Sequence, residues 1–125
     1  MVNRNAPLLK ILYDCVSECN HCASACLEEK DMKLMKDCIL LDLDCSSVCE
    51  VTAEMIARDS AYAMHLLKVC GDICNACAAE CEKHAHLAHC KLCADVCRVC
   101  AEACEQFAVD STQSTAHSTQ SAVGS

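Results

Sequence analysis

The chain has 125 residues and a net charge of −8 at neutral pH, and 16 of its residues are cysteines. This length suits one domain, and the acidic balance argues against nucleic acid as a partner. With 2 glycines, 1 proline, 2 tyrosines and 1 phenylalanine, the sequence has too few turn formers and aromatic side chains for a β-rich domain. We therefore predict an all-α fold.

The first predicted helix has Pro7 in its first turn and continues to about Glu28. Its cysteines are three or four residues apart, and this spacing keeps side chains on one face of a helix. Leu8 and Leu12 extend the same row toward the N-terminus. The cysteines of this row are Cys15, Cys19, Cys22 and Cys26.

A polar turn at residues 29–31 precedes a second predicted helix, which runs from about Met32 to Arg58. Asp31 is the expected N-cap of this helix. The cysteine row on the second helix is interrupted where Asp42 takes the place of a thiol. The row consists of Met35, Cys38, Asp42, Cys45, Cys49, Thr52 and Ile56.

The third predicted helix follows Ser60 as its N-cap and runs from Ala61 to about Lys83. The fourth runs from about Leu87 to Val109. Both have a one-sided row of thiols, and a short turn connects them. The cysteines of these rows are Cys70, Cys74, Cys77 and Cys81, then Cys90, Cys93, Cys97, Cys100 and Cys104.

Residues 110–125 are mostly Ser, Thr, Gln and Ala and show no apolar periodicity. We predict that they form a disordered tail, so that the domain comprises residues 1–109. At the other end, the first residues show no apolar run before a small-residue cleavage site, so we expect no secretory signal. No stretch has the length of a membrane span. We therefore expect a cytoplasmic protein without membrane contact, and a reducing compartment argues against a disulfide framework.

An internal repeat relates the two halves of the chain. A shift of 55 residues places seven cysteines of the first half on cysteines of the second half. Met35 and Asp42 stand where the second half has Cys90 and Cys97. We predict a duplicated helical hairpin that forms an antiparallel, up-down-up-down four-helix bundle with a cysteine-lined core.

The number of thiols points to metal binding. A buried cysteine ordinarily acts as a small hydrophobe, but packing alone does not account for 16 thiols in register on four rows. Disulfides fit poorly, because Cβ vectors three or four residues apart on a helix run side by side. Thiol oxidoreductases place a reactive cysteine at a helix N-terminus, whereas these rows lie mid-helix, so we do not expect an enzyme.

The arrangement of the thiols favours Cu(I). Zinc and iron–sulfur sites usually gather four thiolates from loops. Continuous helical rows instead offer many two- and three-coordinate positions, and these suit a soft monovalent ion. We predict storage of multiple Cu(I) ions on these thiolates, with copper donors and acceptors as partners. A zinc or cadmium thiolate buffer, an iron–sulfur protein and a purely structural helical module are the alternatives.

The cysteine rows resemble those of a known family, the bacterial copper storage proteins. The resemblance rests on the spacings Cys15-x3-Cys19-x2-Cys22-x3-Cys26 and Cys70-x3-Cys74-x2-Cys77-x3-Cys81, with Cys90 to Cys104 opposite them. It covers about Leu8 to Val109 and implies a four-helix bundle whose core fills with Cu(I). It also implies homotetramers, and without a signal peptide the chain is more similar to the cytosolic branch of the family.

The two ends of the predicted bundle differ in chemistry. Antiparallel helices place the turns near residues 30 and 85 at the same end, which carries Met32, Met35, His84, His86 and His89. Thioethers and imidazoles bind Cu(I) transiently, so we predict that copper first lands at this end, which we call the mouth of the bundle. The alternative is that histidines near helix ends are exposed capping residues. The opposite end is predicted to be an apolar plug of Leu8, Leu12, Ile56, Leu67 and Phe107.

Overall fold

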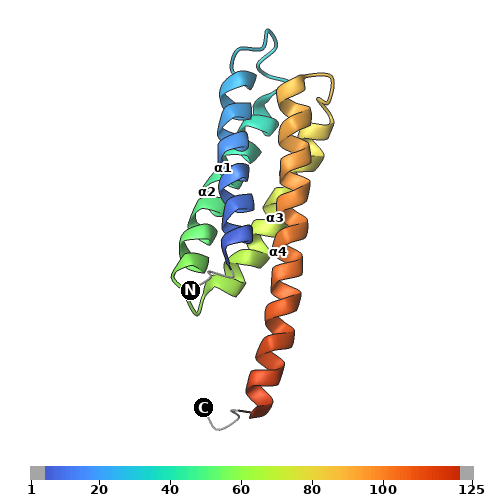
Figure 1. The fold of residues 1–125 in the computed structure, drawn as a ribbon. Helices are drawn as coiled ribbons and strands as arrows, with labels where there is room; N and C mark the ends of the chain where they lie inside the picture. Colours follow the sequence, from blue (N-terminus) through green and yellow to red (C-terminus); the bar gives the residue numbers. More distant parts are fainter. Residues whose placement is uncertain (1–4, 122–125) are drawn as a thin grey trace.

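Residues 5–121 form a bundle of four antiparallel helices (Figure 1). The computed structural model describes residues 5–121, and of the side chains those of residues 5–111. Each helix packs against two others, α1 on α2 and α4, and α3 on α2 and α4. The all-α four-helix bundle expected from the sequence is therefore confirmed. The helices are α1 (Ala6–Cys26), α2 (Lys36–Ala57), α3 (Ala63–Glu82) and α4 (Ala88–Ser121).

The connection before α2 is longer than predicted. Two turns form here, in which the backbone N–H of Leu34 donates to the carbonyl of Asp31 and that of Met35 to the carbonyl of Met32. The N-cap of α2 is Met35 and not Asp31, and no side chain caps this end. The late start turns Met35 into the core and leaves Met32 49% exposed.

The connection between α2 and α3 is fixed by a left-handed residue. Asp59 has a φ of 54°, and the N–H of Ser60 donates to the carbonyl of Met55 at 2.9 Å. This is the Schellman arrangement, which satisfies the last carbonyls of a helix. The side-chain amide of Asn5 donates to the carbonyl of Ile56 at 3.2 Å and to Asp59 Oδ1 at 3.3 Å. The start of α1 is thereby tied to the end of α2.

The third helix starts two residues later than predicted. Its N-cap is Tyr62, whose backbone N–H donates to Ser60 Oγ at 3.1 Å. Ser60 therefore supports the turn before α3 and is not itself the N-cap.

The fourth helix extends beyond the end predicted for it. It continues past Val109 to Ser121, so residues 110–121 are helical where a structureless tail was expected. The sequence contains no glycine or proline between these positions, and the residue types present carry only modest helix penalties. In Figure 1 this segment projects beyond the ends of the other three helices. Residues 122–125 lie outside the described residues.

One glycine inside a helix allows a stability prediction. A Cβ added at Gly71 on α3 would lie 3.8 Å from Cys104 Cβ and 3.9 Å from the Ala101 carbonyl oxygen, which are ordinary contacts. We expect Gly71→Ala to raise the free energy of unfolding by about 0.5–1 kcal/mol, because it restricts the unfolded chain without a clash. Urea midpoints of the reduced, metal-free protein would measure this. Ala76→Gly, at an exposed position of α3, is the matched control and should cost a similar amount. A lower midpoint for Gly71→Ala would contradict the prediction.

Candidate metal centre

The core of the bundle is a continuous column of thiols. All 16 cysteines are buried and unpaired in disulfides, because each helix directs its row toward the bundle axis. Neighbouring sulfurs approach to between 3.5 and 4.0 Å, for example Cys45 Sγ to Cys74 Sγ at 3.6 Å and to Cys15 Sγ at 3.7 Å. These distances are far longer than the S–S bond of a disulfide, about 2.05 Å. The structure therefore brings the predicted thiol rows together as free thiols.

The thiols fall into groups of four that could each hold a metal ion. Within each group the sulfurs lie within 4.8 Å of one another. Some cysteines belong to two groups, so a single thiolate can bridge ions in adjacent groups. Four of the groups are Cys15–Cys49–Cys74–Cys100, Cys15–Cys19–Cys45–Cys97, Cys19–Cys77–Cys93–Cys97 and Cys22–Cys26–Cys38–Cys90.

Asp42 lies in the same column and is fully buried. Three thiols donate to its Oδ1, from Cys77 at 3.2 Å, Cys93 at 3.3 Å and Cys81 at 3.6 Å, and Cys38 donates to Oδ2 at 3.8 Å. Burial, together with the neighbouring sulfurs of Cys93 and Cys77, raises the pKa of this carboxyl to about 10. In the metal-free core the carboxyl is therefore protonated at neutral pH.

The thiols nearest the predicted mouth are also held protonated. Burial raises the pKa of Cys90 to about 11 and shifts the pKa of Cys26 in the same direction. A thiolate binds metal and a thiol does not. Loading must therefore expel protons from this end of the core.

Three of the four residues predicted to receive copper line one hollow. Met35, His84 and His86 surround a hollow of about 360 Å³ at the end of the bundle. His89 does not line it, but its Nε2 lies 3.9 Å from Oε2 of Glu29, which does. The side chains of His84 and His89 are only 14% exposed, and neither Nε2 has a hydrogen-bond partner. Both residues are half-buried, and each Nε2 lies near a carboxylate, that of His84 3.4 Å from Glu80 Oε2 and that of His89 3.9 Å from Glu29 Oε2.

The sequence interpretation missed part of this end. Glu29 was assigned only to a polar turn, yet it contributes a carboxylate to the hollow. The register of a turn cannot be derived from helical periodicity, so no sequence signal placed it there. Met32 lies at a separate hollow, beside Lys33 and Leu40.

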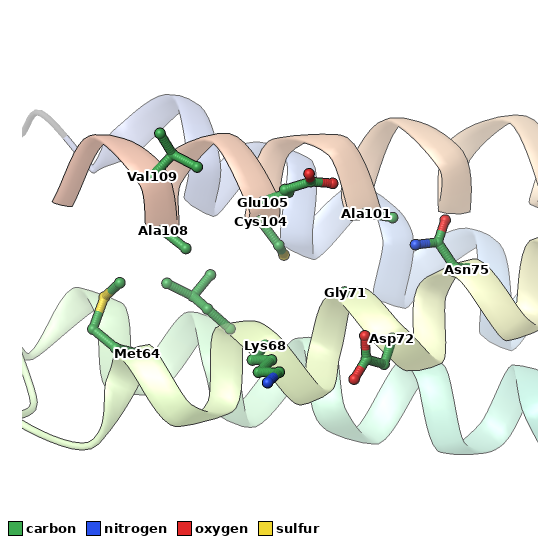
Figure 2. A pocket seen from close by; sticks show the side chains of 11 residues that line it. Met64, Lys68, Gly71, Asp72, Asn75, Ala101, Cys104, Glu105, Ala108 and Val109 are labelled. Carbon is green, nitrogen blue, oxygen red and sulfur yellow. The ribbon is translucent and has the colours of Figure 1, made fainter. Parts of the chain in front are cut away.

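The opposite end is less closed than predicted. Leu8, Leu12, Ile56 and Leu67 are buried as expected, but Phe107 is only half-buried. A groove of about 390 Å³ runs here between α3 and α4, with Cys104 at its floor (Figure 2). Cys104 is 1% exposed, whereas the other 15 thiols are fully buried. The plug is therefore formed by the four aliphatic side chains.

Comparisons with known proteins agree with this geometry. The family model of the copper storage proteins matches residues 1–109, a segment that contains α1, α2, α3 and α4 up to Val109. The chain belongs to the copper storage protein family. The matched segment ends at Val109, within α4.

Several relatives in this family have a known sequence or structure. An uncharacterised cysteine-rich protein of Bacillus subtilis, YhjQ, is 41% identical over 83 residues, which are 66% of this chain and 76% of the relative. The Cu(I)-bound copper storage protein BsCsp3, from the same organism, is 36% identical with a TM-score of 0.80 over 85% of this chain and 99% of that one. A cytosolic copper storage protein of Streptomyces lividans, solved with five coppers, is 35% identical with a TM-score of 0.80. That comparison covers 83% of this chain and 91% of the relative.

None of the helices within residues 5–121 combines the length and hydropathy that crossing a membrane requires.

Proposed function

We propose that this member of the family stores Cu(I), with many ions held by the thiolates of its 16 cysteines. The observation that carries the proposal is the set of overlapping four-thiol groups that run along the core. Soft thiolates select Cu(I) over harder cations. The Cu(I)-bound relative, which shares the fold at 36% identity, supports the same assignment.

Charge balance explains why one ion per thiol is the natural loading. Each Cu(I) neutralises one thiolate, so a core filled near this ratio is roughly neutral. A divalent ion on four thiolates leaves a net negative charge, which is costly where every sulfur is buried. The column therefore suits many monovalent ions better than a few divalent ones.

Copper reaches the column through the end that carries the hollow. Met35, His84, His86 and His89 receive the ion, and the nearest thiols, Cys26, Cys81 and Cys90, take it up. The half-buried imidazoles of His84 and His89, whose Nε2 atoms make no hydrogen bond, support this direction, as does the position of Met35 at the edge of both the core and the hollow.

The store works in the cytosol, where it buffers or detoxifies copper without catalysing a reaction, and it exchanges ions with copper donors and acceptors. The relative described as cytosolic supports this location. The working unit is a homotetramer. Exposed leucines such as Leu40 and Leu43 on α2 offer apolar area for contacts between copies.

The function is tested by counting bound ions. The reduced protein is titrated with Cu(I) against a competing chelator, and we expect tight binding on the order of one ion per thiol. The control replaces the group Cys15, Cys19, Cys45 and Cys97 with serine, which should lower the capacity and leave the remaining sites tight. Saturation of the parent at four ions or fewer would contradict storage and favour separate tetrathiolate sites.

A further inference from the structure

The carboxyl group of Asp42 gives one layer of the core a different ligand chemistry from the rest. Cys22, Cys38, Asp42 and Cys81 form a fully buried group whose ligand atoms lie within 4.8 Å of one another. We propose that these four residues form a zinc(II) site, with one ion per chain, that is filled when the store holds no copper. The inference is independent of copper storage, since it concerns the copper-free protein.

The distances in this layer fit a tetrahedral zinc ion. Bond lengths of about 2.3 Å to sulfur and about 2.0 Å to oxygen place tetrahedral ligands roughly 3.8 Å apart for two sulfurs and roughly 3.5 Å apart for sulfur and oxygen. Cys38 Sγ lies 3.5 Å from Cys81 Sγ and 3.8 Å from Asp42 Oδ2, and Cys81 Sγ lies 3.6 Å from Asp42 Oδ1. The Cys38–Cys81 separation and the distance from each of these sulfurs to one carboxylate oxygen are thus already near the required values. A shift of Cys22 and a rotation of the Asp42 carboxylate, each by less than about 1.5 Å, complete the set around one oxygen.

The ligand set distinguishes zinc from copper. A carboxylate oxygen is a hard ligand, which Cu(I) disfavours and which zinc accepts beside thiolates. Three thiolates and one oxygen also supply the four ligands that zinc prefers, whereas Cu(I) is satisfied by two or three sulfurs. At the position equivalent to Asp42, the second half of the chain has Cys97, which sits in groups made entirely of thiols. The mixed site is therefore specific to this layer.

Two further thiols hold the carboxyl group in place. Cys77 and Cys93 donate to Asp42 Oδ1 at 3.2 and 3.3 Å, from α3 and α4. Neither belongs to the proposed ligand set, so both can stay protonated and orient the carboxylate from outside it. As zinc binds, the carboxyl and the three thiols release their protons to solvent. The filled site then has a net negative charge, and the thiols of Cys77 and Cys93 that donate to Asp42 Oδ1 offset part of the cost of burying it.

Zinc in this layer would link helices that the empty core holds only weakly. Cys22 lies on α1, Cys38 and Asp42 on α2, and Cys81 on α3. A single ion therefore joins three of the four helices. Because three of its ligands are also copper ligands, incoming Cu(I) must displace the zinc.

The site is tested by zinc binding to the reduced, copper-free protein. Competition with a chromophoric zinc chelator should show one tightly bound zinc ion per chain. Asp42→Asn should lower the zinc affinity by at least about 100-fold, because losing a residue that only supports a ligand already costs up to about 100-fold. Asp44→Asn, at an exposed position of the same helix, is the matched control and should bind zinc like the parent. Equal zinc affinity in the parent and Asp42→Asn, or several equivalent zinc ions in both, would overturn the proposal.

A spectroscopic probe covers the case in which the asparagine variant does not fold. Cobalt(II) replaces zinc, and the intensity of its sulfur charge-transfer absorption reports the number of thiolates. We expect three thiolates in the parent and four in Asp42→Cys. An identical cobalt spectrum for both proteins would show that Asp42 is not a ligand. Cu(I) capacity is measured separately on each variant, so a failure of the zinc site is distinguishable from a failure of copper storage.

Discussion

Loading the empty bundle with Cu(I) should raise its unfolding temperature by more than about 20 °C. Apart from Leu12, Leu67, Thr52 and Asp42, the largest fully buried side chains are cysteines, which contribute little apolar area each. An ion that binds only the folded state adds about 4 kcal/mol when its free concentration is 1,000 times its Kd. Four such ions would contribute on the order of 15 kcal/mol, as much as the whole free energy of unfolding of an ordinary domain, about 5–15 kcal/mol.

Thermal unfolding followed by circular dichroism, before and after loading, measures this effect. The variant with serine at Cys15, Cys19, Cys45 and Cys97 should gain less on loading, because one four-thiol group has lost its ligands. Stripping the copper with an excess of chelator should return the parent to its original unfolding temperature. Equal unfolding temperatures with and without copper would instead support a structural helical module.

The arrangement of the core could be predicted from the sequence because it depends on periodicity. Steps of three and four residues fix which side chains share a helix face, and short connections fix antiparallel neighbours. Even Thr52, a polar residue in a buried row, was placed correctly and is fully buried. Its hydroxyl has no hydrogen-bond partner. The helical spacing therefore places Thr52 in the core even though its polar group is not satisfied there.

The features that could not be predicted depend on contacts between helices or on helix ends. The position of Asp42 was evident, but its four thiol neighbours come from three helices, and a single row gives no information about the others. The start of α2 depends on turns at residues 31–35 that no capping side chain marks. The extent of α4 was misjudged because the polar composition after Val109 was taken as disorder, although residues 110–121 contain no glycine or proline.

Removing the soft ligands at the mouth should slow copper loading by at least about tenfold, which corresponds to about 1.4 kcal/mol of barrier. The variant replaces Met35, His84, His86 and His89 with leucine. Its thiols are intact, so its capacity should match that of the parent. Thioether and imidazole groups bind copper weakly and exchange it quickly. They therefore lower the activation barrier for copper transfer to Cys26 and Cys90 without adding tight binding sites.

Two control variants make the direction of loading testable by stopped-flow mixing with a Cu(I)–chelator donor. His21→Leu with His65→Leu removes two exposed imidazoles away from the thiol rows and should load like the parent. Leu12→Ala with Phe107→Ala opens the opposite end, where it should cost about 2–5 kcal/mol of stability for the buried leucine. It should not speed loading, because the groove at that surface is lined by one thioether, that of Met64, and by no imidazole, and Cys104 at its floor is 1% exposed. If the mouth variant loads as fast as the parent while the Leu12/Phe107 variant loads faster, copper enters from the opposite end, and the groove over Cys104 is its route.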